Sequence, residues 1–143
     1  METNNSNNEL ITAMSPTTKV AVYGTLRKGQ GNSSLLGGAM GLGKVQLQGY
    51  EMYTAGGFPV CYRTADKRET IVAELYDVHS IETLQRLDGL EGHPDWYRRE
   101  VVSTPLGPAW IYIMTDQGYK QNSKVESGDW VQRHNKGVIN TCG

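Results

Sequence analysis

The sequence has few cysteines, almost no net charge and no long apolar run. Its two cysteines among 143 residues, Cys61 and Cys142, cannot form the disulfide framework of a small secreted domain, and their spacing fits no metal motif. Fourteen basic residues against 15 acidic ones give a formal net charge of −1, so no general field attracts nucleic acid or an anionic membrane. No apolar stretch reaches the roughly 18 residues that cross a bilayer. We therefore expect a cytoplasmic protein whose partner is a small molecule.

The N-terminal segment also lacks the basic start and apolar core of a secretion signal. It is polar and rich in asparagine, so we predict that residues 1–18 form a disordered leader. Residues 19–143 are predicted to be a single domain, because a chain of this length can bury its own core and neither an interior linker nor a repeat is visible. The sequence does not specify an oligomeric state.

Short apolar or alternating segments, separated by turns that contain glycine and proline, predict a fold dominated by strands. The segments are 20–23, 44–53, 60–62, 70–78, 97–104 and 110–114. A helix is predicted after Ser80, which would cap it, because Ile81, Leu84 and Leu87 recur at helical spacing. A shorter helix is predicted at 32–36. The fold class is therefore α+β, as a small mixed β-barrel of about five to six strands with one or two flanking helices.

The first buried strand ends at a glycine. Val20-Ala-Val-Tyr-Gly24 is apolar up to Gly24, and the chain turns polar after it. Glycine opens backbone conformations that other residues avoid, so the following loop can direct its N–H groups outward. Such a loop at a rigid strand end can hold a carbonyl oxygen or an anion. A strand followed by a glycine turn is also an ordinary connection, so this motif alone does not identify a site.

A second candidate motif surrounds Glu91, where the predicted helix has just ended. Glu91 lies between Leu90 and Gly92, and Trp96 and Tyr97 follow shortly after it. Apolar and aromatic neighbours disfavour the charged carboxylate and raise its pKa towards neutrality, as a proton shuttle requires. The alternative interpretation is a solvated residue at a helix end.

Several motifs together resemble the γ-glutamylcyclotransferase superfamily. They are Tyr23-Gly-Thr-Leu-Arg-Lys-Gly29, Val72-Ala-Glu-Leu-Tyr76, and Leu87-Asp88 followed by Glu91-Gly92, Pro94 and Tyr97-Arg98, in that order and at that spacing. The Gly-Thr-Leu form of the loop, and the proline and tyrosine three and six positions after the glutamate, are more similar to the γ-glutamylaminecyclotransferase branch. The resemblance covers about residues 19–114 and returns at 128–130.

This resemblance implies a β-barrel flanked by helices and a cofactor-independent enzyme. It implies that Tyr23, Gly24, Thr25 and Leu26 hold a small γ-glutamyl substrate and that Glu91 carries the catalytic proton as general acid and base. In a γ-glutamyl amide, the α-amine can attack the γ-carbonyl of the same residue, which closes 5-oxoproline and expels the amine. One carboxyl group can serve both proton transfers, and neither a metal nor a nucleophilic side chain is required.

The alternative function is a non-catalytic binding module that kept the pocket and sequesters a metabolite. A third possibility is an interaction scaffold, which would need an exposed patch of aromatic side chains such as Tyr50, Tyr53, Tyr62 and Trp96. The sequence does not identify the leaving amine.

Three further residues have two interpretations each. Tyr97 could hydrogen-bond Glu91 or the substrate, but a tyrosine at a strand start is more often part of the core. Arg27 could pair with a substrate carboxylate, and a solvated position is the other interpretation. Asp88 lies one helical turn before Glu91, so the two could form a carboxylate pair, or Asp88 could brace the neighbouring loop.

Two other patterns are rejected as sites. Residues 38–44 have the glycine spacing of a phosphate-binding loop, but Val45 replaces the required Ser or Thr, and a strand follows instead of a helix. The three histidines, His79, His93 and His134, share no ligand spacing, so no metal site is predicted.

Overall fold

The computed structural model describes residues 17–24, 26–27, 36 and 38–133. The predicted leader up to residue 16, the predicted helix at 32–36 except for Leu36, and Thr25 lie outside the described residues. Thr18, the last residue of that predicted leader, donates its hydroxyl to Asp77 at 2.7 Å. The elements are β1 (Lys19–Val22), β2 (Met40–Gln48), β3 (Tyr50–Thr54), β4 (Pro59–Arg63), β5 (Thr70–Asp77), α2 (Ile81–Glu91), β6 (Tyr97–Thr104), β7 (Gly107–Met114) and the 3-10 helix η2 (Gln117–Gln121).

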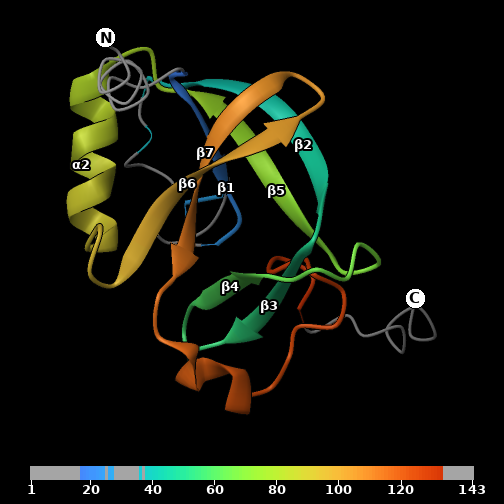
Figure 1. Cartoon of the computed structure of the whole chain (residues 1–143). Coiled ribbons are helices and arrows are strands. Elements are labelled where there is room, and N and C mark those ends of the chain that lie inside the picture. The colour runs from blue at the N-terminus through green and yellow to red at the C-terminus, as the bar shows by residue number, and fades with distance from the viewer. Residues whose placement is uncertain (1–16, 25, 28–35, 37, 134–143) are drawn as a thin grey trace, which may run out of the picture.

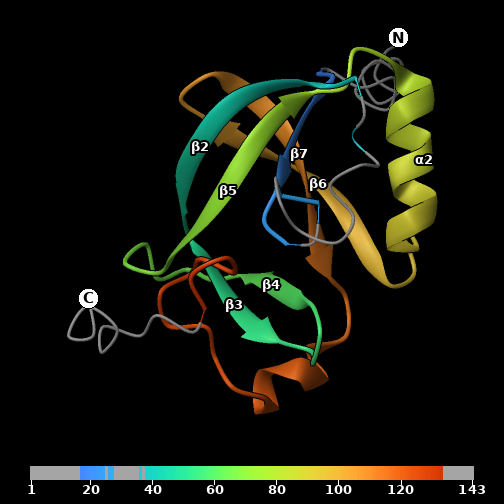
Figure 2. The same ribbon diagram turned by 180° about the vertical axis from the view of Figure 1, so that it is seen from behind.

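Among these residues, five strands form one sheet in the order β2-β5-β1-β7-β6, and β3 and β4 form a separate hairpin. β1 pairs in parallel with β7, and the other neighbours are antiparallel. The sheet curves strongly and the hairpin lies below one end of it, while α2 lies beside β6 (Figures 1 and 2). The predicted α+β class is therefore confirmed. The barrel is not closed, because β2 and β6 remain the two edges of the sheet.

β1 is the centre of the sheet and separates the two halves of the core. Its side chains alternate between the halves, since successive residues of a strand point to opposite faces. Val20 and Val22 pack in the half that contains Leu84 and Leu87 of α2. Ala21 packs in the other half. Burial on both faces explains why this strand has no charged residue after Lys19.

Helix α2 forms as its sequence predicts. The Ser80 side chain accepts a hydrogen bond from the backbone N–H of Thr83, and Leu84 and Leu87 are buried. The helix includes Glu91 and ends at Gly92, whose φ of 68° is a left-handed conformation that glycine adopts without strain. Glu91 is therefore the last residue of the helix, where the sequence analysis had placed it just beyond the end.

The predicted strand 44–53 is two strands. It breaks at Gly49, where φ is +85°, and the Gly49 backbone bonds to Glu69 and Thr64. The first of the two strands, β2, begins earlier than predicted and pairs with β5 through an irregularity between Gly41 and Gly43. The segment with the glycine spacing of a phosphate loop is thus largely part of a strand. No helix in the described part of the chain is long and apolar enough to cross a membrane.

The segment 127–130, part of which carries the family resemblance, packs against the sheet. Trp130 is 2% exposed and belongs to the same half of the core as Ile71 of β5. Gly128 makes this packing possible, because a Cβ atom there would lie 2.1 Å from the Thr70 carbonyl oxygen. Its own carbonyl accepts a hydrogen bond from Val72 at 2.8 Å. This segment therefore belongs to the fold and is not a loose tail.

Candidate active site

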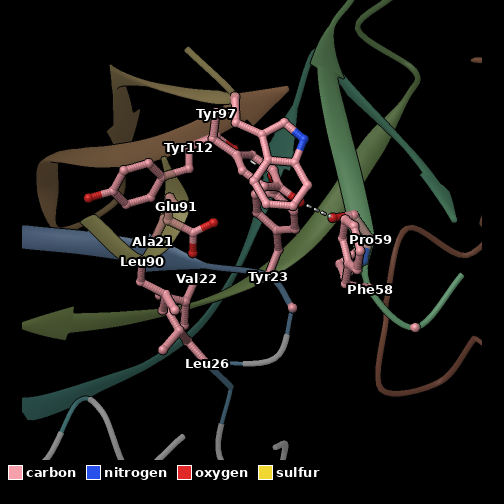
Figure 3. Close-up of a pocket in the computed structure, with 13 residues that line it drawn as sticks. Ala21, Val22, Tyr23, Leu26, Phe58, Pro59, Leu90, Glu91, Tyr97 and Tyr112 are labelled. Atoms are coloured by element: carbon pink, nitrogen blue, oxygen red, sulfur yellow. Dashed lines mark hydrogen bonds between the residues drawn. The ribbon is translucent and has the colours of Figure 1, made fainter. Parts of the chain in front are cut away.

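A cavity of about 290 Å³ lies where the end of β1, the β3–β4 connection and the end of α2 meet (Figure 3). Its walls are almost entirely apolar or aromatic. Thirteen described residues line it: Ala21, Val22, Tyr23, Gly24, Leu26, Gly57, Phe58, Pro59, Leu90, Glu91, Trp96, Tyr97 and Tyr112. A concave, mostly apolar site with few polar groups is typical of small-molecule binding.

The structure brings the two sequence motifs together. Tyr23, Gly24 and Leu26 from the turn after β1 line the same cavity as Glu91 and Tyr97. Thr25, the remaining predicted binding residue, lies outside the described residues. This arrangement follows from the fold. β1 lies at the centre of the sheet, and Leu84 and Leu87 of α2 belong to the same half of the core as Val22.

The carboxyl group of Glu91 points into this cavity (Figure 3). The side chain is largely buried, and loss of hydration raises the pKa of Glu91 from 4.5 to about 7. Burial, and after it the charge of Glu91, also raises the pKa of Tyr97. A carboxyl group with a pKa near neutrality can accept and return a proton at physiological pH.

Two buried tyrosines shape the cavity wall. Tyr23 donates its hydroxyl to the backbone carbonyl of Tyr112, and Tyr97 donates its hydroxyl to the carbonyl of Pro59 at 2.9 Å. Burial raises the pKa of both phenols, which keeps them protonated. Because the Tyr97 hydroxyl proton is donated to Pro59, the Tyr97 oxygen can only accept a hydrogen bond from a bound molecule. Tyr97 is thus both a core residue and a wall residue.

Gly24 is required for a steric reason. A Cβ atom at this position would lie 2.7 Å from Cγ and 2.9 Å from Cδ of Pro59, closer than real contacts allow. Gly24 is not among the glycines with positive φ, so the backbone freedom expected from the sequence is not what selects it. The turn instead packs directly against the β3–β4 hairpin, which places backbone atoms at the cavity surface.

Asp88 braces the end of α2 and does not pair with Glu91. Its two carboxylate oxygens accept hydrogen bonds from Nε and Nη2 of Arg99 at 2.9 and 3.0 Å, and the Tyr112 hydroxyl donates to one of them at 2.6 Å. These bonds tie the last turn of the helix to β6 and β7. Tyr112 also accepts the Tyr23 hydroxyl through its backbone carbonyl, so this residue of β7 is hydrogen-bonded both to Asp88 in the last turn of α2 and to Tyr23 after β1.

Both interpretations of Arg27 are wrong. Its side chain is 2% exposed, and it donates to Glu74 at 3.0 Å and to Asp129 at 2.7 Å. It is therefore neither solvated nor available to a substrate carboxylate, and it holds the turn after β1 against the sheet. The interaction scaffold also loses its basis, since Tyr50 and Tyr62 are buried.

Sequence reasoning missed Tyr112 as a wall residue. It reaches the cavity from β7, far from both motifs, and no local pattern marks it. Among the residues that the structure describes, no three His, Cys, Asp or Glu side chains are grouped as a metal site would need.

Residues 20–132 match the family model described as gamma-glutamyl cyclotransferase, AIG2-like. The chain belongs to this family. It is 34% identical over 117 residues to the gamma-glutamylcyclotransferase family protein YtfP of Escherichia coli, which covers 80% of this chain and 97% of that protein. It is 38% identical over 115 residues to a Vibrio cholerae protein that is provisionally named a gamma-glutamylcyclotransferase. This match covers 80% of this chain and 96% of that protein. The crystal structure of an uncharacterized protein from Pyrococcus horikoshii is similar, with a TM-score of 0.71 and 28% sequence identity. The match covers 86% of this chain and 98% of that chain.

Proposed function

We propose that this protein is a γ-glutamylcyclotransferase that converts a small γ-glutamyl amine or amide into 5-oxoproline and a free amine. The observation that carries the proposal is the carboxyl group of Glu91, with a pKa raised to about 7, inside the apolar cavity that the Tyr23–Gly24 turn also lines. Membership of the family supports the same class of reaction.

In the proposed reaction Glu91 takes part in two proton transfers, because it first accepts a proton and later returns it. The Glu91 carboxylate accepts a proton from the substrate's α-ammonium group, and the resulting amine attacks the γ-carbonyl carbon. Backbone N–H groups of the turn that begins at Gly24 stabilise the oxyanion that forms, and one such donor typically contributes about a hundredfold in rate. The bond from this carbon to the leaving nitrogen then breaks as Glu91 returns its proton to that nitrogen, and the second proton of the attacking nitrogen passes to the departing amine, which leaves in its ammonium form. The step as written needs neither a metal nor a cofactor.

The size of the cavity supports a small substrate. Its volume of about 290 Å³ is at the lower end of the usual range for small-molecule sites, which suits a glutamyl group with a modest amine. The Gly-Thr-Leu form of the turn, and the proline and tyrosine that follow Glu91, are similar to the γ-glutamylaminecyclotransferase branch. They support a simple amine, and not an α-amino acid, as the leaving group. The buried, free thiol of Cys61 supports a cytoplasmic location.

The test is release of 5-oxoproline, measured by mass spectrometry, from γ-glutamyl-amino acids, γ-glutamyl-ε-lysine and γ-glutamylated small amines. Glu82→Gln is the matched control for Glu91→Gln, because Glu82 is exposed in the first turn of the same helix. Wild type and the control should release 5-oxoproline and free amine in equal amounts, and Glu91→Gln should release none. Substantial turnover by Glu91→Gln would refute the mechanism. Stoichiometric capture of intact ligand by wild type would favour the binding module.

A further inference from the structure

We infer that a buried ion cluster of Arg27, Glu74 and Asp129, the Arg27 cluster, sets the position of the turn after β1, so that Arg27 is a positioning residue for the proposed reaction. The inference rests on the proposed function, in which backbone N–H groups of this turn stabilise the oxyanion. It adds that the rate depends on Glu74 in β5 and on Asp129 in the segment 127–130, although neither lines the active-site cavity.

Arg27 closes the turn through its backbone. Its N–H donates to the Gly24 carbonyl at 3.0 Å, so these two residues bracket the turn. Leu26, the residue before Arg27, is buried and lines the active-site cavity (Figure 3). The Arg27 side chain does not line that cavity and instead borders a second one, together with Glu74. Arg27 therefore acts on the reaction through the turn and not by touching the substrate.

The Arg27 side chain anchors the turn through two different nitrogens. Nε donates to Glu74 at 3.0 Å, and Nη1 donates to Asp129 at 2.7 Å. The Arg27 side chain is 2% exposed, and the two carboxylates are 14% and 16% exposed, so salt screens these ion pairs little. Charge-assisted bonds from a planar guanidinium fix its direction as well as its position. The cluster thus ties one end of the turn to β5 and to the segment 127–130.

Packing fixes the other end of the turn, because Gly24 lies directly against the Pro59 ring. A turn that is held at both ends keeps its N–H groups in place before substrate binds. The oxyanion exists only in the transition state and in the intermediate that follows it. Displaced N–H groups therefore lower kcat more than they change KM. A displacement of about 1 Å can cost about a hundredfold in rate.

The charges of the cluster give each variant a different expected effect. Arg27→Met removes the cation that the two carboxylates share, and should lower kcat by about 10- to 100-fold while KM changes less than about threefold. Arg27→Lys keeps the charge but cannot direct two donors in the same geometry, so its kcat should be intermediate. Asp129→Asn leaves Arg27 paired with Glu74 and weakens one charge-assisted bond, so kcat should fall by about 3- to 10-fold. Its amide oxygen can still accept the Val131 N–H, which Asp129 accepts at 3.1 Å.

The experiment measures kcat and KM for 5-oxoproline release, using the fastest substrate of the panel above. Glu126→Gln is the matched control for Asp129→Asn, because it removes an exposed acid three residues earlier and should keep the wild-type kcat. Calorimetry of substrate binding, with Glu91→Gln added to each variant, should give one site per chain, which excludes a loss of folded protein as the cause of a lower kcat. Adding Asp129→Asn to Arg27→Met should cause no further fall, because Asp129 acts through Arg27.

The outcomes separate this inference from the proposed function. Release by wild type with an unchanged kcat in Arg27→Met and Asp129→Asn would overturn the positioning role and leave the proposed function intact. A lower kcat that is matched by fewer binding sites, or a further fall in the double variant, would also overturn it. If Arg27→Met is unfolded in circular dichroism, Arg27→Lys and Asp129→Asn decide by the same criteria. Absence of release by wild type would refute the proposed function, and this inference with it.

Discussion

Replacing Glu91 by glutamine should stabilise the protein at alkaline pH and change its stability little near pH 4. Burial raises the pKa of this carboxyl group from 4.5 to about 7. One pKa unit corresponds to about 1.4 kcal/mol, so ionised Glu91 lowers the free energy of unfolding by up to about 3 kcal/mol. This penalty is absent below the pKa of the unfolded chain, grows as the pH rises from 4.5 to about 7, and is complete above that. Glutamine has nearly the same shape without the charge, so the variant avoids the penalty.

Urea denaturation of wild type, Glu91→Gln and Glu82→Gln across this pH range measures the effect. The free energy of unfolding of Glu91→Gln minus that of wild type should rise from near zero at about pH 4 to about 3 kcal/mol above pH 8. Glu82→Gln should follow wild type, because Glu82 is exposed. A difference for Glu91→Gln that is constant with pH, or that falls as pH rises, would refute the argument that Glu91 is buried and uncompensated.

Three other substitutions test the packing around the site. Gly24→Ala should lose about 1 to 3 kcal/mol of unfolding free energy and most 5-oxoproline release, because its Cβ would lie 2.7 Å from Pro59; wild-type behaviour in both assays would show that the contact relaxes freely. Asp88→Asn should lose about 2 kcal/mol and lower kcat more than it changes KM, because it loosens the helix end that carries the proposed proton shuttle; unchanged kcat would contradict a positioning role. Gly128→Ala should lose at least about 3 kcal/mol of unfolding free energy, or show an unfolded circular dichroism spectrum, because the φ of residue 128 is +69° and the new Cβ would lie 2.1 Å from the Thr70 carbonyl oxygen. A stable variant would mean that this segment packs differently.

Local patterns predicted the parts of the fold that local physics determines. The alternating segment 70–78 predicted β5, and the apolar residues that alternate along it, Ile71, Ala73 and Leu75, are all buried. Ser80 and Gly92 mark the two ends of α2 through hydrogen bonding of the cap and a left-handed residue, which are properties of a few neighbouring residues. The motif carrying Glu91 was visible because its apolar neighbours are adjacent in sequence.

Long-range contacts were not predictable in the same way. Arg27 is buried because Glu74 and Asp129, distant in the chain, both meet it, and nothing next to Arg27 in the sequence indicates these partners. Gly24 is selected by its contact with Pro59 of the hairpin, not by its own backbone angles. The open sheet also depends on which strands are neighbours, and alternation within one strand does not specify this order.

The central claim is that ionised Glu91 accepts the substrate's proton, and the pH dependence of kcat/KM for 5-oxoproline release tests it most directly. Release by wild type should rise with pH through an apparent pKa of about 7, the value that burial gives to Glu91, and Glu91→Gln should show no release at any pH. An activity that is level from pH 5 to 8, or a profile that Glu91→Gln shares, would contradict the claim.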